Sequence, residues 1–244
     1  MPFRFTEADV ALARDVFPYY RIGEGDEKMA KITTGQIAEL IAQSDAGRIT
    51  RAMMARFLRS PTLLDPWGEF YEKEFGLAVN LAEKNIPPQP DQGKWRLLVI
   101  ASGVTIEGAY QQCKTAFGSW KYTETSLDEV IIQNERDTSN GSYAIWVRDG
   151  AEADEELKNT SADQIAERGI TTETLLECLI HNLAFFRETG KRLDVVNVTL
   201  CAGSRLSDGN VPSVDTRSDG KLRVHWIRPG DALVHLRARQ AVSL

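Results

Sequence analysis

The chain has 244 residues, of which 42% are hydrophobic and 26% are charged, a composition typical of a globular protein long enough for two modest domains. A net charge of −6 and a pI of about 5.3 argue against a protein whose whole surface binds the nucleic-acid backbone. The three cysteines are odd in number and widely spaced, which argues against a disulfide framework and favours a reducing compartment. The charged N-terminus lacks a signal-peptide core, and no apolar run approaches the ~18 residues of a membrane span, so we expect a cytoplasmic protein.

The first part of the chain, residues 1–88, predicts a helical module. Apolar residues at helical spacing, with capping signals, indicate helices over residues 5–17, 33–45, 50–60 and 65–85. Gly76 weakens the last of these helices. The segment IPPQPDQGK, residues 86–94, holds three prolines and a glycine and predicts a stiff connector between two domains.

The second part, residues 93–244, alternates between strand and helix patterns. The fold class that we predict is α+β, with the helical N-terminal module followed by a mixed α/β C-terminal domain. Residues 126–137 fit either a helix or a strand. The other predicted elements are strands over 95–102, 142–149, 194–201 and 221–227, two strands within 233–244, and helices over 105–117, 161–169 and 171–190.

The N-terminal helices on either side of AGRIT, residues 46–50, resemble a helix-turn-helix. Four arginines in the turn and the second helix are suited to contact phosphates or guanine edges: Arg48, Arg51, Arg56 and Arg59. Residues 1–60 hold nine Lys/Arg and eight Asp/Glu, however, so they carry a net charge of only +1. Two short helices joined by a glycine turn also build ordinary helical bundles, so packing or partner docking is the competing interpretation.

The residues that often carry catalysis or metals form no recognisable motif. His181, His225 and His235 have no metal-site spacing, and the sequence contains no Walker A loop, GxGxxG or GxSxG. Cys201 with His225 or His235 and an aspartate would be a thiol-nucleophile site. The alternative is a buried thiol at the end of a strand. We therefore expect no cofactor, no metal and no enzymatic activity.

The segment from residue 203 to 235 is predicted to be rich in polar loops between apolar strands, where binding sites are common. A tryptophan among arginines is also typical of interface hot spots. Alternatively these residues form an ordinary solvated surface, and Trp226 lies in the core. The Asp and Asn side chains would then form the hydrogen bonds of local turns. The same side chains could also ligate calcium, but the sequence lacks the full spacing of an EF-hand. The candidate ligand-binding residues are Arg205, Asp208, Asn210, Arg217, Asp219, Arg223, His225, Trp226 and Arg228.

Two resemblances follow from the same segment. The pattern GS-R-SDG-VP at residues 203–212, then Val224, Trp226 and the closing LRARQAVS at 236–243, is similar to a group of bacterial proteins often seen in reduced-genome lineages and without an assigned activity. The order of helix 105–117, Gly-Ser, tryptophan strand and arginine-rich final strand resembles the C-type-lectin fold. That fold includes formylglycine-generating enzymes and the variable proteins of diversity-generating retroelements.

The lectin-fold resemblance implies that C-terminal loops bind ligands on a structural scaffold. The chain departs from the pattern because it lacks the paired cysteines of classical lectins and the catalytic cysteine pair of the formylglycine enzymes. We therefore predict a non-enzymatic recognition protein that presents its C-terminal loops to a protein partner or another ligand. The alternative is a DNA-binding regulator that uses the N-terminal arginines.

Overall fold

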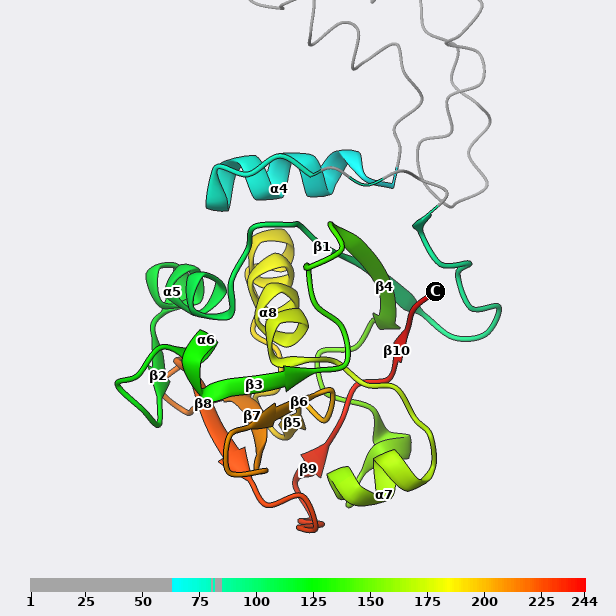
Figure 1. The fold of residues 1–244 in the computed structure, drawn as a ribbon, viewed down its shortest axis with the longest axis vertical. Coiled ribbons are helices and arrows are strands. Elements are labelled where there is room, and N and C mark those ends of the chain that lie inside the picture. Colours follow the sequence, from blue (N-terminus) through cyan, green and yellow to red (C-terminus); the bar gives the residue numbers. More distant parts are fainter. Residues whose placement is uncertain (1–62, 80, 82–84) are drawn as a thin grey trace, which may run out of the picture. The chain divides into compact units, whose positions relative to one another are not determined.

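The structure is a computed structural model that describes residues 63–79, 81 and 85–244 (Figure 1). These residues belong to one compact unit, Leu63–Leu244. The predicted helices before residue 63, with Arg48, Arg51, Arg56 and Arg59, lie outside the described residues. Helices and strands mix throughout the unit, which confirms the α+β class. Its helices are α4 Asp65–Phe75, α5 Ile106–Phe117, α6 Leu127–Val130, the 3-10 helix η3 Glu155–Leu157, α7 Ala162–Glu167 and α8 Leu175–Thr189.

The described strands form three sheets. An antiparallel sheet has the order β1-β4-β10, a mixed sheet has the order β2-β8-β7-β5-β9, and β3 pairs with β6. In the mixed sheet, β2 runs parallel to β8 and β5 parallel to β9, while β7 is antiparallel to β8 and β5. The strands are β1 Trp95–Ile100, β2 Ser119–Lys121, β3 Ile131–Asn134, β4 Tyr143–Arg148, β5 Val198–Leu200, β6 Ser204–Leu206, β7 Val211–Thr216, β8 Leu222–Ile227, β9 Leu236–Arg237 and β10 Ala241–Val242.

Helix α8 lies at the centre of the unit and contacts α5, β1 and β7 (Figure 1). Its ends follow the sequence signals: Thr174 and Glu177 form a capping box, and Gly190 ends the helix with a φ of 68°. Leu175, Leu179 and Leu183 are fully buried along it. The apolar face of the helix predicted over 171–190 therefore forms part of the main core, together with inner side chains of β1, β4, β7 and β8.

A second, smaller core lies under α7. Ala162 and Ile165 of this helix pack with Leu200, Val211 and other buried side chains of the mixed sheet. The helix begins at Ser161, which forms a capping box with Gln164, as the sequence predicts. One end of the mixed sheet is thus covered by α7.

Helix α4 packs on the main core and ends early. Tyr71 is fully buried, and its hydroxyl donates a hydrogen bond of 2.7 Å to the carbonyl oxygen of Val99 in β1. The helix predicted over 65–85 ends after Phe75: Gly76 takes a left-handed φ of 65°, and the described residues 77–79 and 81 are not helical. Glycine adopts this conformation without the steric cost that other residues incur, so it ends the helix.

The segment expected to be loop-rich contains more strand than the sequence predicts. Strands β6 and β7 lie within it, and all six residues of β7 are buried. Pro212 and Asp215 in β7 are not typical strand formers, so only the pairing with β5 and β8 reveals the strand. Residues 126–137, which fit both patterns, form the short helix α6 and then β3.

Candidate functional site

The β7–β8 hairpin separates the predicted binding residues into groups. Strand β7 joins two turns, one with Asp208 and Asn210 before it and one with Arg217 and Asp219 after it. Six residues of extended strand span about 20 Å, so these two turns lie at opposite ends of the sheet. The nine predicted residues therefore do not share one rim.

The acidic residues in both turns serve the local backbone. Asp208 accepts hydrogen bonds from the backbone N–H and the side-chain amide of Asn210, at 3.0 and 2.8 Å. Asp219 likewise accepts the backbone N–H of Lys221 at 3.1 Å. Glycines at positive φ follow both aspartates, as such turns require. Within residues 63–79, 81 and 85–244, no group of three or more His, Cys, Asp or Glu side chains is placed to hold a metal ion.

The remaining predicted residues differ in their exposure and in the contacts that their side chains already make. The Arg205 guanidinium donates hydrogen bonds to the carbonyl oxygens of Ala202 and Ser204, so it holds the backbone between β5 and β6 in place. Arg228 is exposed just after β8. Trp226 is partly buried and packs against the main core, as one of the two sequence interpretations proposed.

Arg223 and His225 lie in the middle of the sheet, beside an aromatic pair that the sequence analysis missed. Trp120 of β2 is the register partner of Arg223 and is 43% exposed. Its ring stacks on His225, with centroids 6.1 Å apart and planes inclined by 19°. Trp226 also stacks on His225 at 5.6 Å, and Tyr122 lies 6.3 Å from the same imidazole. We call Trp120, Tyr122, His225 and Trp226 the aromatic strip.

Charged groups border the aromatic strip. Arg223 donates from Nε and Nη2 to the two carboxylate oxygens of Asp215, at 2.8 and 3.0 Å, which fixes the guanidinium beside Trp120. Burial, and then the Asp208 carboxylate, raise the pKa of Tyr122, so Asp208 lies near this ring. Nδ1 of His225 is within 2.9 Å of the Trp226 carbonyl oxygen, and the hydrogen bonds of the described residues leave its Nε2 unused.

A second polar cluster is completely enclosed. Glu173 lies 2.8 Å from Nδ1 of His181, and Arg239 forms an ion pair of 2.8 Å with Asp194; all four side chains are 0–1% exposed. Burial raises the pKa of Glu173 to about 8 and lowers that of His181 well below its ordinary range. With no access from solvent, this cluster ties the segments before α8, β5 and β10 together rather than contacting a ligand.

The thiols lack the properties of a nucleophile. All three cysteines are free and buried. Burial raises the pKa of Cys201, and a hydrogen bond with Cys201 together with burial raises that of Cys178. A catalytic thiol instead needs a lowered pKa and access to substrate. The geometry thus favours the interpretation of Cys201 as a buried residue at the end of a strand.

Comparisons with known proteins add no relative: no family model, no curated protein and no solved structure matches the chain. None of the helices in the part of the chain that the structure describes combines the length and the apolar character needed to cross a bilayer.

Proposed function

We propose that the protein is a non-enzymatic recognition module that binds a protein partner through the aromatic strip. The observation that carries the proposal is Trp120: a large apolar side chain, 43% exposed, held on a paired strand and stacked on His225. Leaving a tryptophan in water forgoes the free energy that burying its ring would provide. A partner that covers it recovers that free energy.

The neighbours of Trp120 support a protein as the ligand. Tryptophan, tyrosine and arginine are the residues enriched at interface hot spots, and Trp120, Tyr122 and Arg223 bring all three together. Arg223 is already oriented by Asp215, so little side-chain entropy is lost when a partner contacts it. Asp208 near Tyr122 adds a negative group at the border.

The scaffold is part of the proposal. The resemblance to the C-type-lectin fold and to retroelement variable proteins favours a stable core that presents a C-terminal surface. In this chain that surface is the aromatic strip of β2 and β8 with the β6–β7 turn, instead of all loops between 203 and 235. The DNA-binding alternative rests on Arg48, Arg51, Arg56 and Arg59 and stays a prediction.

The test compares variants of the intact protein in partner capture and then in calorimetry with the purified partner. Trp120→Ala and Arg228→Ala probe the strip and its border, and Arg168→Ala is the matched control because Arg168 is an exposed arginine at the end of α7, on a different element from the strip. Truncating a hot-spot tryptophan costs at least about 2 kcal/mol, so Trp120→Ala should weaken binding about 30-fold. Arg168→Ala should bind like the wild type. Unchanged affinity of Trp120→Ala would refute the proposal.

A further inference from the structure

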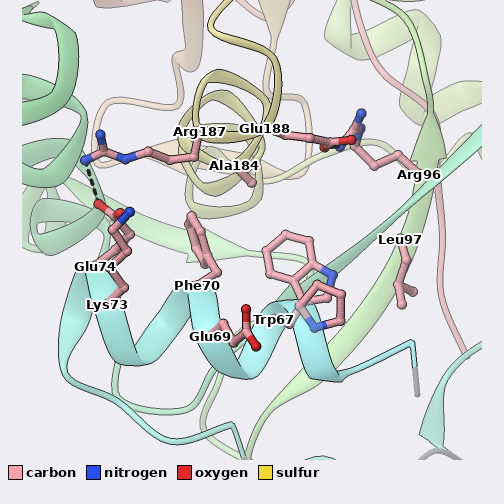
Figure 2. Close-up of a pocket in the computed structure, with 11 residues that line it drawn as sticks. Trp67, Glu69, Phe70, Lys73, Glu74, Arg96, Leu97, Ala184, Arg187 and Glu188 are labelled. Atoms are coloured by element: carbon pink, nitrogen blue, oxygen red, sulfur yellow. Dashed lines mark hydrogen bonds and ion pairs between the residues drawn. The ribbon is translucent and has the colours of Figure 1, made fainter. Parts of the chain in front are cut away.

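A cavity of about 430 Å³ opens between α4, α8 and β1, away from the residues of the aromatic strip (Figure 2). Its apolar wall is formed by Trp67 and Phe70 of α4, with Leu97 and Ala184 opposite. The rings of Trp67 and Phe70 meet edge to face, 5.4 Å apart at 76°. This volume falls in the usual range for small-molecule sites, roughly 300–1,000 Å³.

One end of the cavity carries a positive charge. Nη2 of Arg187 donates a hydrogen bond of 2.7 Å to Glu74, whose side chain is only 5% exposed, so the guanidinium is held in place (Figure 2). Lys73 lines the same end and forms no ion pair with another described residue. Two cations and one carboxylate leave a formal charge of +1, and the other donors of Arg187 are free to contact an anion.

The other end carries a negative charge. Arg96 forms ion pairs with two carboxylates, with Asp149 at 2.9 Å and with Glu188. Figure 2 shows Arg96 beside Glu188. Glu69 of α4, which also lines the cavity and lies nearer Trp67 than Lys73 in Figure 2, adds a third carboxylate, so one cation and three carboxylates leave a formal charge of −2. Trp67 and Lys73 are six residues apart on α4, which corresponds to about 9 Å along the helix axis. The cavity therefore presents opposite charges at the two ends of an apolar wall.

We propose that this cavity binds a short peptide with free termini and an apolar side chain. Its C-terminal carboxylate contacts Lys73 and Arg187, its N-terminal ammonium contacts Glu188, and its apolar side chain covers Trp67 and Phe70. Three extended residues span about 10 Å, which is comparable to the rise of about 9 Å along α4 from Trp67 to Lys73. This inference goes beyond the proposed recognition of a protein partner, because it uses different residues on different elements.

The test titrates the intact protein with the tripeptide Ala-Phe-Ala by calorimetry, beside its N-acetylated and C-amidated forms. We expect saturable 1:1 binding with a Kd below about 1 mM for the free peptide, and binding at least about fivefold weaker for each capped form. Lys73→Gln should weaken the free peptide about fivefold and leave the affinity for the C-amidated peptide unchanged. Lys158→Gln, which changes an exposed lysine of the segment after η3, should have no effect.

A cavity-filling variant keeps the test decisive. Ala184→Leu places a larger side chain in the cavity and should abolish binding, while a thermal melt verifies that the variant folds. Equal affinities for the free and both capped peptides, or full affinity of a folded Ala184→Leu, overturn the inference. Trp120→Ala should bind the tripeptide like the wild type, so failure of the proposed function and failure of this inference are distinguishable.

Discussion

Replacing Glu173 with glutamine tests whether this buried carboxyl group is protonated in the folded protein. Glu173 is fully buried, and burial raises its pKa from 4.5 to about 8. Its Oε1 lies 2.8 Å from Nδ1 of His181, and burial lowers the pKa of this imidazole. At pH 6.5 the folded protein therefore holds a neutral acid beside a neutral histidine, whereas the unfolded chain has an ionised glutamate.

The sign and size of the effect follow from the protons bound. Relative to the unfolded chain, the folded chain binds about one extra proton at Glu173 at pH 6.5 and about half a proton at pH 8, so the free energy of unfolding falls as pH rises. One full proton corresponds to about 1.4 kcal/mol for each pH unit, so this decline gives a loss of about 1.6 kcal/mol between pH 6.5 and 8. Glutamine has nearly the same shape and does not titrate, so Glu173→Gln should lack this loss. The range also lies above the pKa of Asp154, which burial raises to about 6.

The assay is urea unfolding, followed by tryptophan fluorescence, at four pH values between 6.5 and 8. Glu156→Gln is the control because Glu156 is an exposed glutamate, and it should follow the wild type. The wild-type free energy of unfolding should fall relative to that of Glu173→Gln as the pH rises. Parallel curves for the two proteins would mean that Glu173 is ionised in the folded state, and the reasoning would be refuted.

Three other predictions concern the thiols, the buried ion pair and the N-terminal arginines. Because their pKa values are raised and they are buried, all three cysteine thiols should react with iodoacetamide only after denaturation, as followed by mass spectrometry; native labelling of Cys201 would instead support a nucleophile. Asp194→Ala should lower the free energy of unfolding in urea by about 3–5 kcal/mol, since the Arg239 guanidinium stays buried without its carboxylate, and a loss under about 1 kcal/mol would contradict this. If the alternative function holds, duplex DNA should show a salt-sensitive gel shift that Arg51→Ala with Arg56→Ala removes, and the absence of a wild-type shift would end that hypothesis.

Features that depend on neighbours in the sequence were predictable. Thr105 and Ser161 cap the helices predicted over 105–117 and 161–169, and Gly190 ends α8, as predicted. The helix predicted over 171–190 begins later, after Thr174, where Thr174 and Glu177 form a capping box. Cap signals act within one helical turn, so a single sequence carries them completely. The buried strands β1 and β4 were also visible as continuous apolar runs.

Features that depend on distant pairing were not predictable. Trp120 and Tyr122 alternate with Lys121 in a strand pattern, but β2 has only three residues, and its partner β8 begins a hundred residues later. Arg239 and Asp194 are polar residues 45 positions apart, and their sequence surroundings give no sign that they are buried together. Charged residues are expected at the surface, and only the tertiary structure shows the pairing that allows their burial.

The central claim, that the aromatic strip binds a protein partner, is tested most directly by photo-crosslinking. A photoreactive p-benzoylphenylalanine replaces Trp120 in one variant and Val196 in another. Val196 is 78% exposed and precedes β5, which is three strand spacings, or about 14 Å, from β2. The account predicts a discrete crosslinked protein from position 120, lost when unlabelled wild-type protein competes, and none from position 196. Crosslinking to the same proteins from both positions, or none from position 120, would contradict it.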